Sequence, residues 1–134
     1  MHYVDKIDQW VKAHMFSKLE NRKFYEIDKL SGGMGAYRTY ANKHLTIRVI
    51  CDRGIYDIEV GPSGQDREMW SVGFVKDYLE PATKGRWNLN LEQSLDFIVS
   101  NYSWFVENFT QSQYKDTFKK IDERCKYTFE NSAS

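Results

Sequence analysis

The segment 45–60, LTIRVICDRGIYDIEV, constrains the fold more than any other part of the chain, because it predicts a β-hairpin turning at Arg53 and Gly54. Paired residues of a hairpin share one face of the sheet. In this register one face is apolar and carries Ile47, Val49, Cys51, Tyr56, Ile58 and Val60. The other face is polar, with Arg48 opposite Glu59 and Ile50 opposite Asp57. A slip by one residue would mix the two faces, so the register is well specified.

Two further strands are expected before the hairpin, over residues 24–30 and 36–41. The apolar alternation over 24–30 is imperfect, which indicates an edge strand. The glycine-rich link 31–35 joins these two strands, and Asn42-Lys43 turns into the hairpin. Links this short favour sequential pairing, so we expect a four-stranded antiparallel meander.

Apolar side chains recur at helical spacing in three segments. The first covers residues 4–20, the second begins after the N-cap Asn90 and runs over 91–109, and the third covers 111–129. Ser71 is a candidate cap for a short helix, although a strand over 69–75 fits the same residues. Amphipathic helices cover the apolar face of an antiparallel sheet. The chain is therefore expected to be one α+β domain, 1–134, with a frayed tail over 131–134.

The formal net charge is zero, which argues against a dedicated nucleic-acid binder. Charge is nevertheless distributed unevenly. Residues 1–50 hold nine lysines and arginines against five acidic residues, whereas residues 52–80 hold three against seven. This is either ordinary variation on a solvated surface or an acidic face made for a basic partner.

No motif for catalysis or for cofactor binding is evident. The three histidines, at positions 2, 14 and 44, fall in different expected elements and lack metal-ligand spacing. The SGGMG cluster lacks the GK[ST] ending of a phosphate loop. Cys51 and Cys125 have no CxxC partner, and neither a signal peptide nor a membrane span is recognised. We expect a cytoplasmic, non-enzymatic protein that uses no metal or cofactor and binds neither nucleic acid nor membrane.

Candidate contact residues for a protein partner come from the acidic segment. Asp57 and Glu59 share the polar face of the hairpin, and Asp66 and Glu68 follow in the next loop. Trp70 lies beside them, and an exposed tryptophan is a frequent anchor of protein interfaces. These five residues form the expected partner-binding set.

The run over residues 37–79 resembles a diffuse group of small bacterial proteins. It combines a strand ending in Asp52-Arg53-Gly54, a second strand IYDIEV, a loop rich in glycine and proline, and a segment led by Trp70. Some members of that group resemble immunity proteins of polymorphic toxin systems. The resemblance implies a protein that binds and blocks a toxin, with a basic toxin domain as its partner.

Two other functions fit the same residues. The many aromatic side chains could line a pocket between sheet and helices, in a small-molecule-binding module or an enzyme of unfamiliar type. An exposed edge strand over 24–30 would instead suit a structural subunit of a larger assembly.

Overall fold

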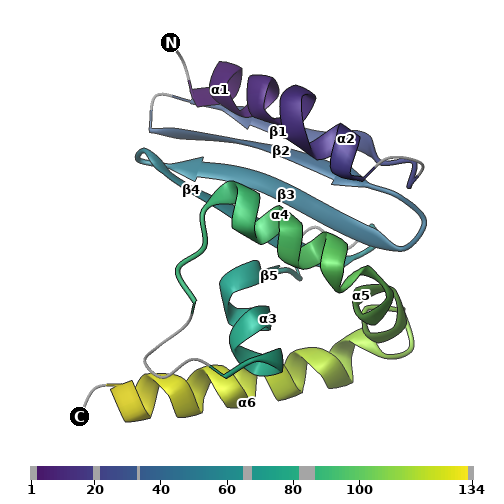
Figure 1. Cartoon of the computed structure of the whole chain (residues 1–134), viewed down its shortest axis with the longest axis vertical. Helices are drawn as coiled ribbons and strands as arrows, with labels where there is room; N and C mark the ends of the chain where they lie inside the picture. The colour runs from purple at the N-terminus through teal and green to yellow at the C-terminus, as the bar shows by residue number, and fades with distance from the viewer. Residues whose placement is uncertain (1–2, 20–21, 33, 65–67, 82–86, 133–134) are drawn as a thin grey trace.

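The computed structural model describes residues 3–19, 22–32, 34–64, 68–81 and 87–132, with side chains up to Tyr127. It has an antiparallel sheet with helices, which confirms the α+β class (Figure 1). The strands follow each other in the sheet in sequence order: β1 Tyr25–Ser31, β2 Gly35–Ala41, β3 Leu45–Asp52, β4 Ile55–Pro62 and β5 Trp70–Ser71. The expected four-stranded meander thus has a fifth strand. Two residues are too few to show a period, so apolar alternation does not identify β5.

The predicted hairpin register is confirmed. β3 and β4 pair Val49 with Ile58 and Arg48 with Glu59. The turn residues Arg53 and Gly54 have φ angles of 52° and 85°. Positive φ at both positions is the requirement of a type I′ turn, whose twist matches that of the strands.

The N-terminal helical segment consists of α1 (Tyr3–Trp10), the π-helical turn η1 (Val11–Met15) and α2 (Phe16–Lys18). Its buried stripe repeats every four residues, at Ile7, Val11, Met15 and Leu19. In a regular α-helix such spacing would rotate the stripe by about 40° at each step. The wider π turn, closed by a bond from the Phe16 N–H to the Val11 carbonyl, offsets part of this rotation. The stripe therefore stays on the sheet.

The predicted helix over 91–109 is wrong in one respect, because it is two helices. α4 (Leu91–Ser100) ends at Asn101, and α5 (Tyr102–Asn108) begins directly after it. Asn101 leaves helical geometry at φ −115° and ψ 24°, and its side-chain amide donates to the Phe97 carbonyl. This bond competes with the continuing helical ladder, as asparagine side chains commonly do.

Both readings of the segment after the β4 loop are partly correct. Residues 70–71 form β5, and α3 (Val72–Leu79) follows with Ser71 at its N-cap position. The last helix, α6, covers Tyr114–Ser132. Two residues of the expected tail, 131 and 132, are thus helical, whereas 133–134 lie outside the described residues.

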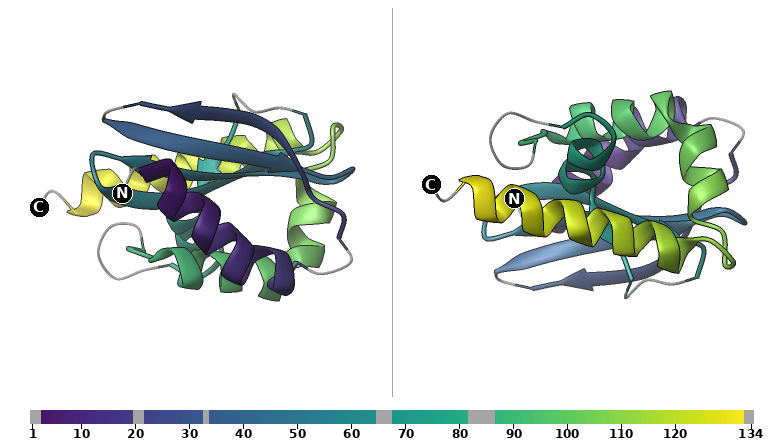
Figure 2. Two further views of the ribbon diagram at one scale, coloured as in Figure 1. Left: turned by 90° about the horizontal axis from the view of Figure 1, so that it is seen from above. Right: turned by 90° about the horizontal axis from the view of Figure 1, so that it is seen from below.

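The helices are arranged mostly on one side of the sheet. α1 packs on β2 and β3, and α4 packs on β4, so the two lie side by side on what we call the inner face (Figures 1 and 2). α6 packs mainly on α3, beyond the β5 edge. Edge-to-face aromatic contacts link this outlying part to the core through Phe97, Phe105, Phe109, Phe118, Trp70 and Phe74. These six residues account for part of the high aromatic content of the sequence.

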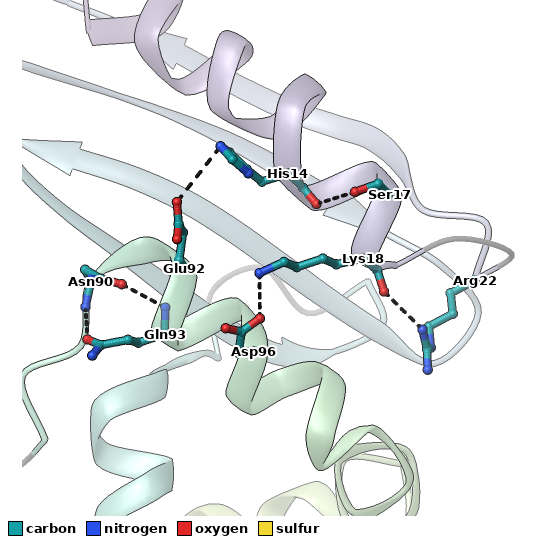
Figure 3. A network of polar contacts seen from close by, with 8 residues as sticks. All are labelled: His14, Ser17, Lys18, Arg22, Asn90, Glu92, Gln93 and Asp96. Carbon is teal, nitrogen blue, oxygen red and sulfur yellow. Dashed lines mark hydrogen bonds and ion pairs between the residues drawn. The ribbon is translucent and has the colours of Figure 1, made fainter.

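Polar contacts at the surface link the N-terminal helical segment to α4 (Figure 3). The Lys18 ammonium lies 2.6 Å from the Asp96 carboxylate, and the His14 imidazole lies 4.0 Å from Glu92. α4 begins with a capping box in which Asn90 and Gln93 exchange side-chain-to-backbone hydrogen bonds. Asn90 is thus confirmed as the N-cap.

Candidate functional site

The face of the sheet opposite to α1 and α4, which we call the outer face, carries a polar row across all five strands. The row consists of Asp28, Thr39, Arg48, Glu59 and Ser71, which are aligned by the strand register. Asp57 lies on the same face in the neighbouring row, opposite Ile50. The alignment follows from the two-residue period of the strands, which sends alternate side chains to opposite faces.

Arg48 is the centre of the row. Its Nε donates to the Thr39 hydroxyl at 2.9 Å, and a terminal nitrogen lies 3.8 Å from the Asp28 carboxylate. The guanidinium carbon sits 4.2 Å from the centre of the Tyr37 ring, whose hydroxyl donates to Asp28 at 3.1 Å. Only 15% of the Arg48 side chain is exposed. These contacts hold the guanidinium in one place, where its positive charge lies next to the acidic groups of the outer face.

The described part of the outer face has more carboxylates than cations, because its only cation is Arg48. Asp28, Asp57 and Glu59 surround Arg48, and burial raises the pKa of the Glu59 carboxyl. The nearby Arg48 opposes this rise in pKa, whereas the negative charge of Asp57 adds to it. A cation from a partner would stabilise these charged carboxylates further. The face can therefore accept hydrogen bonds and positive charge from a basic surface.

The expected partner-binding set is divided between three locations. Asp57 and Glu59 lie together on the outer face, and Asp66 lies outside the described residues. Glu68 is exposed, but its carboxylate accepts a hydrogen bond from the Tyr114 hydroxyl in α6, which raises the pKa of Tyr114. Trp70 is half-buried, with its ring in edge-to-face contact with aromatic residues of α3 and α6. Its contacts are those of a packing residue.

One acidic residue of the segment 52–80 belongs to the interior. Asp77 in α3 is 1% exposed, and Arg124 in α6 donates to both of its carboxylate oxygens, at 3.1 and 3.3 Å. The negative charge of Asp77 is therefore matched inside the fold. The surface of this segment is less acidic than its composition suggests.

A cavity of about 730 Å³ lies at the end of the sheet where β2 turns into β3. We call it the turn cavity. Its walls come from the two residues at positions 22 and 23, from the first residue of β1, from the β2–β3 turn and from α5. The lining residues are Arg22, Lys23, Tyr25, Asn42, Lys43, His44 and Tyr102.

Among the described residues, no three His, Cys, Asp or Glu side chains lie together as metal ligands would. Cys51 is buried and Cys125 is half-buried, and the two form no disulfide. No helix in the described ranges is both long and apolar enough to cross a membrane.

Comparisons with models of protein families, with curated proteins and with solved structures found no match to this chain.

Sequence reasoning missed the turn cavity because its residues are dispersed. Its cations lie at positions 22, 23 and 43, before β1 and after β2 in the sequence. The only sequence signal was the positive excess of residues 1–50. A net charge over fifty residues carries no information about which side chains meet.

Proposed function

We propose that this chain is a non-enzymatic, cytoplasmic interaction protein that binds a basic protein domain with the outer face of its sheet. In the form suggested by its resemblance to immunity proteins, the partner is a toxin whose active site is covered by this surface. Carboxylates of the outer face would then take the place of the negative charge of the toxin's substrate. The mechanism is occlusion, so it requires no chemistry from this chain.

The observation that carries this proposal is the acidic row around Arg48. The guanidinium is nearly buried and already engages Thr39 and Tyr37, so it does not project toward a partner. The three carboxylates next to it leave an excess of negative charge on a face that α1 and α4 do not cover (Figure 2). Charge complementarity of this kind accelerates association and selects partners of opposite sign.

The test begins with affinity capture from the host lysate, washed first at low and then at high salt. We expect one stoichiometric partner with a basic domain, released by salt. The reversals Asp57→Lys and Glu59→Lys together should slow association, more at low salt than at high salt. A milder pair, Asp57→Asn with Glu59→Gln, removes the charges without placing lysines beside Arg48.

The matched control reverses two exposed carboxylates elsewhere, Asp5 in α1 and Glu107 in α5, to lysine. The control changes net charge by the same amount, so it should leave most of the affinity intact. A partner whose affinity ignores the outer-face pair and the salt concentration would contradict the proposal.

A structural subunit is a second candidate, because the predicted edge strand is present. Within the described residues β1 pairs only with β2, and three of its apolar side chains are exposed: Tyr25 at 62%, Ile27 at 41% and Leu30 at 54%. A bulge between Glu26 and Asp28 weakens this edge as a pairing template. Sedimentation of the purified chain tests whether it is a structural subunit. Assembly that depends on concentration and is abolished by Ile27→Lys would favour this function. A monomer at all concentrations would reject it.

A further inference from the structure

We propose that the turn cavity is a binding site for a small phosphorylated molecule that carries a planar ring, of about the size of a mononucleotide. The cavity volume of about 730 Å³ lies within the range of small-molecule sites. This site is separate from the outer-face interaction and does not depend on it.

No carboxylate in the part of the chain that the structure describes pairs with the cations that line the cavity. Neither Arg22, Lys23 nor Lys43 forms an ion pair with any described residue. By contrast, the other described arginines all lie within 4.0 Å of a carboxylate: Arg38, Arg48, Arg53 and Arg124. What distinguishes Lys23 and Lys43 is that they line one cavity together with Arg22, and three cations gathered in this way favour an anionic ligand.

The number of cations points to phosphate. A single carboxylate would neutralise only one of the three, whereas a phosphate monoester carries close to two negative charges at neutral pH. Guanidinium and ammonium groups are the usual side-chain donors to phosphate oxygens. The imidazole of His44, which lines the same cavity, can supply a further hydrogen bond.

Asn42 holds the walls of the cavity together. Its amide nitrogen donates to the Arg22 carbonyl and to the Tyr102 hydroxyl, both at 2.8 Å. Its amide oxygen accepts from the backbone N–H groups of His44 and Leu45, also at 2.8 Å. With 5% exposure, Asn42 uses all four of its hydrogen-bonding positions inside the protein. The cavity is thus formed before any ligand arrives, which lowers the cost of binding.

The two tyrosines supply the aromatic part of the site. Arg22 places its guanidinium carbon 4.3 Å from the centre of the Tyr102 ring, which fixes this cation in the wall. Tyr25 also lines the cavity, and 62% of its surface is exposed. A planar heterocycle can stack on such a ring, as bases do on exposed aromatic side chains.

The backbone at Lys23, like that at Arg53 in the β3–β4 turn, has a positive φ. Its φ of 56° lies in the left-handed region, which residues other than glycine, asparagine and aspartate rarely occupy. Such strain persists where the surrounding structure enforces it and is concentrated at functional sites. A glycine would relieve the strain but would remove the cation from the cavity.

The test titrates the isotope-labelled full chain with the four nucleoside 5′-monophosphates, their nucleosides and inorganic phosphate, followed by amide chemical shifts. We expect at least one monophosphate to shift the amides of Lys43 and His44. Its affinity should exceed that of its nucleoside and that of inorganic phosphate by at least tenfold.

Variants separate the two halves of the ligand. Lys23→Ala with Lys43→Ala should weaken monophosphate binding at least tenfold, whereas the control Lys12→Ala with Lys119→Ala, at exposed positions outside the cavity, should leave binding unchanged. Tyr25→Ala should reduce the affinity of the monophosphate to that of inorganic phosphate. Thermal unfolding of each variant verifies that it is folded, because the substituted side chains are exposed.

Three results would overturn the proposal. The first is the absence of shifts at cavity residues up to 10 mM of every monophosphate. The second is equal binding of inorganic phosphate and nucleotide, which removes the ring from the ligand. The third is tighter binding of a single-stranded RNA decamer, with shifts extending beyond the cavity, which makes the site part of a nucleic-acid surface. The Asp57/Glu59 variants should bind the nucleotide normally, so the two proposals can fail independently.

Discussion

Arg124 donates two hydrogen bonds to the buried carboxylate of Asp77 and thereby ties α6 to α3. The carboxylate is 1% exposed and the arginine side chain 21% exposed, so the pair is largely removed from water. A buried charge that loses its partner is strongly destabilising, whereas loss of an exposed ion pair costs little. Lys120 and Asp116 form an exposed ion pair on the same helix, which provides a matched control.

Arg124→Met should lower the free energy of unfolding by about 3 kcal/mol, because it removes the guanidinium that donates twice to the buried Asp77 carboxylate. Lys120→Met removes the exposed pair with Asp116 from the same helix and should cost less than about 0.5 kcal/mol. Urea unfolding at neutral pH measures both values. Equal effects of the two substitutions would show that burial of Asp77 carries no energetic weight.

Ser94→Ala should stabilise the protein. The Ser94 hydroxyl in α4 is fully buried and has no hydrogen-bond partner among the described residues. Removing an unsatisfied buried hydroxyl should raise the free energy of unfolding by about 1 kcal/mol. Ser100→Ala, at an exposed position of the same helix, is the control and should change stability by less than about 0.5 kcal/mol. Destabilisation by Ser94→Ala would mean that the hydroxyl is satisfied in solution.

Tyr40 should make the fold sensitive to alkali. Burial, together with the charges of Asp8 and Glu26, raises the pKa of Tyr40 to about 12 from its usual 10.0, although Arg38 acts in the opposite direction. Because the folded protein holds this proton more tightly, the stabilisation is complete below pH 10 and is lost as pH rises toward 12.

The measurement compares urea unfolding of the natural chain and of Tyr40→Phe between pH 8 and pH 11. The natural chain should lose stability relative to Tyr40→Phe above pH 10, by up to about 1.4 kcal/mol per pH unit. Parallel curves would show that Tyr40 titrates alike in the folded and unfolded chains.

Arg53→Asn should stabilise the β3–β4 hairpin. Arg53 has a φ of 52°, a conformation that asparagine tolerates better than arginine and that type I′ turns favour. The exposed contact of Arg53 with Asp52, at 3.9 Å, contributes little. We expect a gain of about 0.5 kcal/mol in the free energy of unfolding. Arg53→Ala lacks this conformational advantage, so a gain of the same size with alanine would contradict the explanation.

The sequence predicted contacts between residues that are close in the chain better than contacts between residues that are far apart. The Arg48–Glu59 and Val49–Ile58 pairs were predictable, because hairpin partners are close in sequence and side chains alternate with period two. The N-cap Asn90 and the edge position of β1 were likewise predictable from local pattern. The break at Asn101 was not, since the apolar spacing continues across it while the chain changes direction.

The candidate sites show the same division. Sequence placed Asp57 and Glu59 together on the outer face, because a single hairpin presents both. Only the tertiary structure placed Asp28 beside Arg48, buried Asp77 against Arg124, and brought Lys23 and Lys43 to one cavity. Local periodicity decides which face a side chain occupies, but contacts between distant segments are decided by packing, which no local pattern encodes.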